Sequence, residues 1–102
     1  MKKVINGKCY NTETAEECAR WSNDLSTNDF HYCSETLYRT RKGTYFLFGK
    51  GGAASRYSEP VGNMRGAGTK IVPLTENEAR YWMEQHFDGD DFEAVFGEVE
   101  EA

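Results

Sequence analysis

The chain has 102 residues, a formal net charge of -5 and a mean hydropathy of -0.76. The length suits one domain, and with 38% hydrophobic and 14% aromatic residues the chain is too apolar to be disordered. No apolar run approaches the roughly 18 residues that cross a bilayer, and Asn6 and Gly7 end the N-terminal apolar stretch too early for a signal peptide. Cys9, Cys18 and Cys33 are odd in number and widely spaced, which favours reduced thiols and a cytoplasmic location.

Two β-hairpins are predicted in the first half of the chain. Asn6-Gly7, within residues 4–10, is the strongest two-residue hairpin signal, because both central residues of a type I′ turn have positive φ. Residues 36–40 and 44–48 are rich in aromatic and β-branched residues, and the loop between them ends in glycine. We therefore expect a second hairpin over these residues.

Between the hairpins the pattern predicts a helix. Thr14 with Glu17 three residues later has the form of a capping box. Ala15, Cys18 and Ala19 then recur at helical spacing, and the polar run 22–24 ends the element.

The composition changes over residues 49–68, where six glycines fall within twenty residues. We interpret this stretch as a long glycine-rich loop, of the kind that is usually functional or disordered. Residues 70–74 predict a last strand, and Pro73 requires an edge or terminal position because it has no N–H to donate.

Two helices are predicted near the C-terminus. Thr75 and Glu78 form a second capping box before an amphipathic pattern, and residues 90–97 predict a short helix that ends at glycine. The expected fold is α+β: an antiparallel sheet of about five strands, made of two hairpins plus one strand, with two to three helices packed on one face. Residues 1–97 form the domain, and 98–102 form an acidic tail.

Charge is distributed unevenly along the chain. Residues 36–70 hold seven basic residues against one acid, whereas residues 71–102 hold one basic residue against ten acids. Such asymmetry indicates either two charged faces for partners or two segments that neutralise each other in the fold.

Catalytic and metal sites are not expected. Cys9, Cys18, Cys33 and His31 are residue types that zinc accepts, but their spacing matches no zinc-site pattern. The pair His31 and Cys33 is a weak nucleophile signal, and the glycines after residue 48 match neither a Walker A loop nor a dinucleotide motif. We therefore expect no enzyme, no metal and no cofactor.

Protein interaction fits the remaining features best, since tyrosine and arginine are enriched at interface hot spots. Two surfaces compete for this role, a basic one on the glycine-rich loop and an acidic one that could imitate nucleic-acid phosphates. The candidate contact residues are Lys50, Arg56, Tyr57 and Arg65 on the first surface, and Asp88, Asp90, Asp91, Glu98, Glu100 and Glu101 on the second.

Nucleic-acid binding by the basic stretch 39–65 is the alternative. Basic residues alternate with aromatic ones there, so that cations could neutralise phosphates while rings stack on bases. Against it stand the net charge of -5 and the isoelectric point near 5.0. The candidate residues are Arg39, Arg41 and Lys42.

Residues 3–15, 35–43, 46–52 and 70–79 are spread over nearly the whole chain, and together they resemble a family of short proteins carried by phages and mobile elements of Gram-positive gut bacteria. The resemblance implies no catalytic residues. It does imply a similarity in size and style to anti-CRISPR and other anti-defence inhibitors, and hence a host CRISPR or other defence effector, such as a nuclease, as partner.

Overall fold

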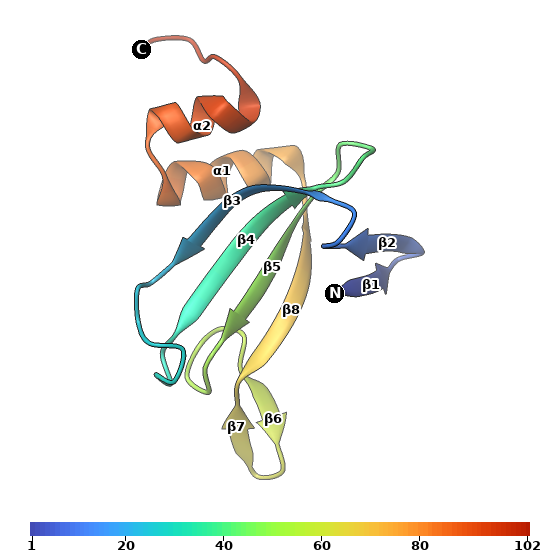
Figure 1. Ribbon diagram of the computed structural model, residues 1–102, viewed down its shortest axis with the longest axis vertical. Coiled ribbons are helices and arrows are strands. Elements are labelled where there is room, and N and C mark those ends of the chain that lie inside the picture. Colours follow the sequence, from blue (N-terminus) through green and yellow to red (C-terminus); the bar gives the residue numbers. More distant parts are fainter.

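A four-stranded antiparallel sheet forms the centre of the computed structural model, which describes all residues from Met1 to Ala102 (Figure 1). The strand order is β3-β4-β5-β8, so that neighbours in the sheet are β3 with β4, β4 with β5, and β5 with β8. The strands span Glu16–Ser22 (β3), Cys33–Arg39 (β4), Tyr45–Gly51 (β5) and Gly68–Leu74 (β8).

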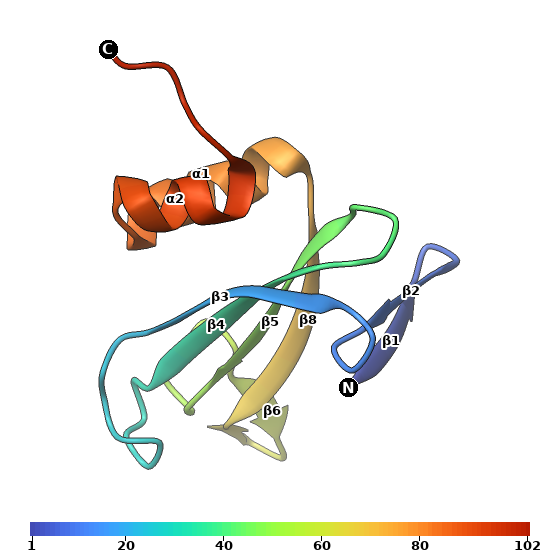
Figure 2. The same ribbon diagram turned by 45° about the horizontal axis from the view of Figure 1, so that its top comes forward.

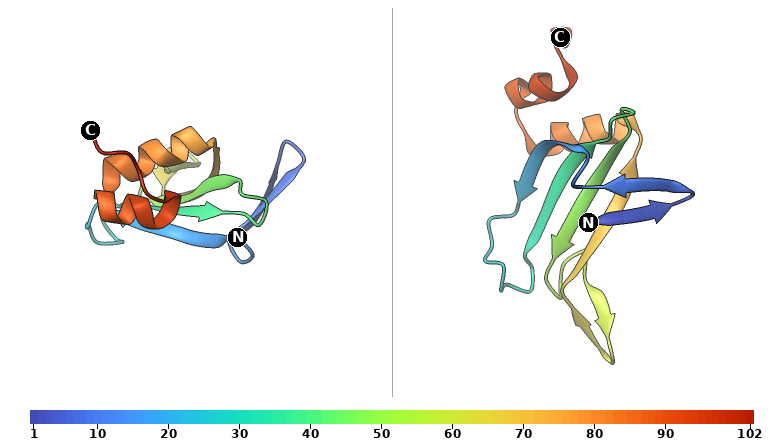
Figure 3. Two further views of the ribbon diagram at one scale, coloured as in Figure 1. Left: turned by 90° about the horizontal axis from the view of Figure 1, so that it is seen from above. Right: turned by 45° about the vertical axis from the view of Figure 1, so that its right-hand side comes forward.

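Two small hairpins and two helices complete the fold. Strands β1 (Lys2–Ile5) and β2 (Lys8–Asn11) pair with each other, as do β6 (Glu59–Val61) and β7 (Met64–Gly66). Helices α1 (Glu76–His86) and α2 (Gly89–Phe96) lie together over one end of the sheet (Figures 2 and 3). The predicted α+β class is confirmed, and the two helices lie within the predicted two to three. The prediction of a single sheet of about five strands is wrong, because the β1–β2 hairpin pairs only with itself and the strands form three sheets.

The predicted helix after residue 14 is wrong, because this segment forms β3. It pairs with β4 along its length, from Glu16 opposite Arg39 to Ser22 opposite Ser34. A register shift between Glu17 and Ala19 marks a β-bulge. The bulge adds one residue to β3, so the residues that face inward no longer alternate with a regular period of two. The resulting spacing of apolar residues resembles that of a helix, which explains the wrong prediction.

The glycine-rich stretch is more regular than the sequence predicted. Strand β5 continues to Gly51, the β6–β7 hairpin turns at Gly62 with a φ of 61°, and β8 begins at Gly68. The unstructured part is thus confined to the short connections, chiefly residues 52–58. The hairpin extends past the end of the sheet and contributes to dimensions of 50 × 32 × 20 Å (Figure 1).

The sheet has apolar residues on both faces. Leu37 and Leu47 pack with Met83 and other residues of the helices, whereas Phe46 and Ile71 pack with Tyr10 of β2. The alternation follows from the period of two along a strand. The helices therefore cover one face, and the β1–β2 hairpin is anchored against the other.

The turns and caps follow the sequence closely. Asn6 and Gly7 have the positive φ values of the predicted hairpin turn, 50° and 77°. Helix α1 begins at the predicted capping box of Thr75 and Glu78. Pro73 lies in β8, which is an edge strand, as its missing N–H requires. Neither helix has the length and apolar character needed to span a membrane.

Candidate functional site

The structure places one carboxylate, that of Glu35, inside the protein. Glu35 lies in β4 opposite Trp21 of β3 and Gly49 of β5, on the face that the helices cover. Its exposed fraction is 2%. A buried carboxylate is costly unless charges and hydrogen-bond donors compensate it, so the groups around Glu35 define its role.

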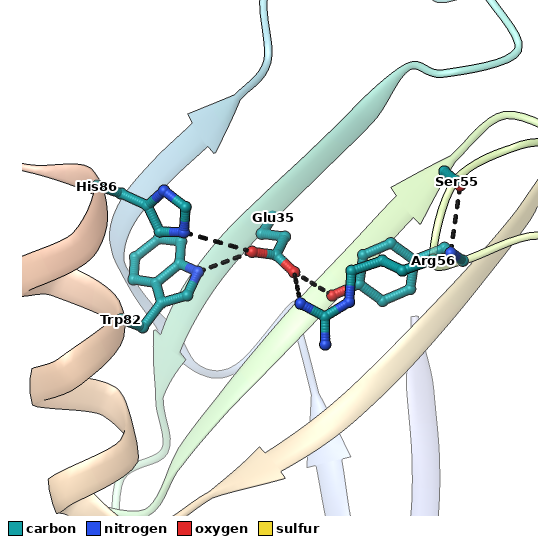
Figure 4. A network of polar contacts seen from close by, with 6 residues as sticks. Glu35, Ser55, Arg56, Trp82 and His86 are labelled. Atoms are coloured by element: carbon teal, nitrogen blue, oxygen red, sulfur yellow. Dashed lines mark hydrogen bonds and ion pairs between the residues drawn. The ribbon is translucent and has the colours of Figure 1, made fainter.

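Both oxygens of Glu35 accept a hydrogen bond. The indole Nε1 of Trp82 donates to Oε1 at 2.8 Å, and the hydroxyl of Tyr57 donates to Oε2. Nη1 of Arg56 lies 3.4 Å from Oε2, and Nε2 of His86 lies 3.9 Å from Oε1 (Figure 4). Glu35, Arg56, Tyr57, Trp82 and His86 are called the Glu35 cluster below.

The cluster joins three elements that are distant in sequence. Arg56 and Tyr57 come from the connection between β5 and β6, while Trp82 and His86 lie one helical turn apart on α1. Gly49 makes room for the Tyr57 ring, since a Cβ at this position would clash with it. The backbone N–H of Tyr57 donates to Oγ of Ser55 at 3.2 Å, which fixes the connection locally (Figure 4).

Burial changes the acidity of two members of the Glu35 cluster. It raises the pKa of Tyr57, as does the hydrogen bond to Glu35, so that the hydroxyl remains a donor at neutral pH. Burial lowers the pKa of His86, although the nearby Glu35 opposes this effect. The neutral imidazole packs against Trp21, with ring centroids 4.3 Å apart and ring planes tilted by 35°. The charge of Glu35 is therefore balanced by Arg56 alone.

A groove opens beside the Glu35 cluster and has a volume of about 460 Å³. The Arg56 side chain is 66% exposed, and Tyr81 of α1 is 62% exposed. The groove thus combines an exposed aromatic ring, a guanidinium group that pairs with Glu35, and two amide side chains. We call it the Glu35 groove; its lining includes Arg56, Asn77, Tyr81, Trp82, Gln85 and His86.

The residues of the predicted basic surface do not form one surface in the structure. Arg56 and Tyr57 meet at Glu35, but Tyr57 is buried and offers no contact to a partner. Lys50 is exposed on β5 and lines a different groove. Arg65 of β7 donates to the carbonyl and hydroxyl oxygens of Ser58, from 2.7 to 3.1 Å.

The predicted acidic residues lie at the α2 end of the molecule, away from the β6–β7 hairpin (Figure 1). Asp88 is the N-cap of α2 and accepts a hydrogen bond from the N–H of Asp91 at 3.0 Å. Asp90 and Asp91 occupy the first helical turn, where negative charge favours the helix dipole. Glu98 follows the helix and is exposed, as are Glu100 and Glu101. The structure therefore gives Asp88 a structural role and leaves the other acids accessible.

The residues predicted for the alternative function, nucleic-acid binding, also lie in different surroundings. Arg39 pairs with Glu16 of β3 at 2.9 Å. Arg41 and Lys42 are exposed in the turn between β4 and β5 and form no ion pair.

The cysteines are all free. Burial raises the pKa values of Cys18 and Cys33, so both remain thiols at neutral pH. His31 lies in a turn before β4, whereas Cys33 is the first residue of β4, so the two residues do not share a strand. No three side chains of histidine, cysteine or acidic residues converge as metal ligands would.

Sequence reasoning missed the centre of the site. Glu35, Tyr81 and Trp82 were not candidates, because nothing local distinguishes a buried acid from an exposed one. The one signal that the sequence offers is the position of Glu35, a single acidic residue between Ser34 and Thr36 in a strand whose other residues are mostly uncharged. No protein-family model, curated protein or solved structure matches this chain.

Proposed function

We propose that the chain is a non-enzymatic protein-interaction module that contacts its partner through the Glu35 groove. The observation that carries the proposal is the pairing of Arg56 with the buried Glu35, which places an exposed guanidinium in the same groove as the exposed ring of Tyr81. Tyrosine and arginine dominate interface hot spots, and groups that are already ordered lose less entropy on binding.

The chemistry of the Glu35 cluster supports binding rather than catalysis. A general base must reach the proton it removes, but Glu35 is buried and both of its oxygens already accept hydrogen bonds. Tyr57 and Cys33 have raised pKa values and are poor nucleophiles at neutral pH. These groups stabilise the groove wall, and the exposed residues beside them make the contact.

The partner that we propose is a bacterial defence effector, such as a CRISPR nuclease, in the cytoplasm of the host cell. This part of the proposal is supported by the resemblance to proteins of phages and mobile elements. The chain would then act as a phage-encoded inhibitor that covers a functional surface of the nuclease.

Affinity capture from a bacterial lysate, with and without nuclease treatment, tests the proposal. The wild-type chain should retain a protein partner that mass spectrometry identifies, and Tyr81→Ala should lose it, since the substitution removes the exposed ring from the groove. Phe30→Ala is the matched control, because Phe30 is also an exposed aromatic side chain, at 70%, and does not line the groove.

Two results would contradict the proposal. One is a partner retained by Tyr81→Ala as firmly as by the wild type, which would place the contact elsewhere. The other is the recovery of nucleic acid with no protein that survives nuclease treatment. A bacterial defence nuclease among the captured proteins would support the proposed inhibitor function. Inhibition of that nuclease, in purified form, by the chain would establish this function.

A further inference from the structure

We propose that a second groove, between the β1–β2 hairpin and the β4–β5 turn, binds the phosphate backbone of nucleic acid. The groove has a volume of about 530 Å³ and lies apart from the Glu35 groove, with no lining residue in common. We call it the Lys8 groove. Its lining includes Lys8, Asn11, Thr14, Arg41, Lys42 and Thr44.

The cations of the Lys8 groove have no partners within the protein. Lys8, Arg41 and Lys42 are exposed, and none of them forms an ion pair. No acidic residue lines the groove. Lys2 and Lys3 add charge nearby, since they lie in β1 opposite Asn11 and Tyr10 of β2. Positive charge is thus concentrated here although the whole chain is acidic.

Both walls of the Lys8 groove are held in place. In the β4–β5 turn, the N–H of Thr40 donates to the carbonyl of Thr44 at 2.8 Å, and the N–H of Gly43 donates to that of Thr40 at 2.9 Å. A hairpin as short as β1–β2 is marginally stable alone, but Tyr10 anchors it through edge-to-face contact with Phe46. The cations are therefore presented on a preformed concave surface.

The chemistry of the lining favours phosphate over an acidic protein segment. Besides the cations, the groove offers hydroxyl and amide groups from Thr14, Thr44 and Asn11, which are typical of contacts to phosphate and sugar. Its one aromatic residue, Tyr10, is buried, so no apolar anchor of the kind that protein interfaces require is exposed. The absence of an exposed ring also excludes stacking on bases, so binding is independent of sequence.

The acidic end of the protein does not cancel this local charge. The C-terminal segment and α2 lie at the upper left of Figure 2, whereas the β1–β2 hairpin lies at the right-hand side of the molecule. At physiological ionic strength, interactions between exposed charges are screened beyond about 8 Å. A phosphate in the Lys8 groove therefore responds mainly to Lys8, Arg41 and Lys42.

Fluorescence anisotropy with a labelled single-stranded DNA of about 20 nucleotides tests the inference. Binding should weaken with salt, with a slope of log affinity against log salt near -2, because about 0.7 counterions are released for each neutralised phosphate. The triple variant Lys8→Gln, Arg41→Gln, Lys42→Gln should lose at least about tenfold in affinity in about 50 mM salt and should nearly lose the salt dependence.

The matched control is the triple variant Lys50→Gln, Arg65→Gln, Lys70→Gln, which changes the net charge equally at the other end of the sheet. It should bind within about twofold of the wild type. All six residues are exposed, so melting curves should show both variants folded. Equal loss in the two variants, absence of DNA binding by the wild type at low salt, or equally strong competition by an oligo-glutamate peptide would overturn the proposal.

Discussion

The Glu35 cluster and the Lys8 groove use charged residues in opposite ways. In the cluster, the buried carboxylate accepts two hydrogen bonds and lies beside a guanidinium, so that its charge is compensated inside the protein. In the groove, the exposed cations have no acid beside them. Compensated charge holds elements together, whereas uncompensated charge on a concave surface favours an external anion. The comparison separates a charge that stabilises the fold, that of Glu35, from charges that remain available to an external anion.

Removal of the Glu35 side chain should have the largest effect. Glu35→Ala leaves the indole N–H of Trp82, the hydroxyl of Tyr57 and the guanidinium of Arg56 without their acceptor. The guanidinium is largely exposed and returns to water, but each of the two buried donors left without an acceptor typically costs about 1–3 kcal/mol. Urea unfolding should show a loss of this size, and a loss below about 1 kcal/mol would mean that the cluster does not stabilise the fold.

Removal of one hydroxyl should have a smaller effect that depends on position. Tyr57→Phe leaves an oxygen of Glu35 without its donor inside the protein, which costs about 1–3 kcal/mol. Tyr81→Phe deletes the same atom from an exposed ring and should change the free energy of unfolding by no more than about 0.5 kcal/mol. Equal effects on urea unfolding would show that the buried bond contributes nothing.

Acidification should weaken the fold through His86. Burial lowers its pKa in the folded state below the ordinary value of 6.5, so the unfolded chain binds the proton more readily. The contribution of the neutral ring is complete above about pH 6.5 and decreases as the pH falls through the lowered pKa. The rings of Trp21 and Trp82, the carboxylate of Glu35 and the guanidinium of Arg56 face this imidazole.

The measurement is thermal unfolding between pH 7.5 and 5.5, with His86→Gln as the comparison. The wild type should lose stability over this range more steeply than the variant, which cannot titrate at this position. Parallel pH profiles would exclude His86 as the cause.

Neutralisation of the Lys8 groove should have the smallest effect on stability. Lys8→Gln, Arg41→Gln and Lys42→Gln remove charges that have no internal partner, so the free energy of unfolding should change by no more than about 0.5 kcal/mol for each. Differential scanning fluorimetry of the three single variants gives the answer. A clear destabilisation would assign these cations to the structure and weaken the contrast with the Glu35 cluster.

Local signals in the sequence predicted the local structure well. Asn6-Gly7, Gly43 and the capping box at Thr75 each specify backbone geometry within a few residues, and the structure has a turn or a helix start at each. The segment from Glu16 to Ser22 was predicted as a helix because its strand contains a bulge, and because pairing with β4 overrides local spacing.

The candidate site was predicted less well, for a physical reason. Arg56 and Tyr57 were recognised as exposed loop residues, but their contact is an acid 22 positions from Tyr57 along the chain. Trp82 lies 47 positions from the same acid. Such contacts depend on how α1 and the 52–58 connection fold over the sheet, and no local pattern encodes that arrangement.

The binding affinity of Tyr81→Ala for the captured partner, measured by calorimetry with purified proteins, tests the proposed function most directly. We predict at least a tenfold loss, about 1.4 kcal/mol, with a melting temperature close to that of the wild type. Unchanged affinity for Tyr81→Ala, together with a loss when Asp90 and Asp91 are both replaced by lysine, would contradict the assignment and move the contact surface to α2.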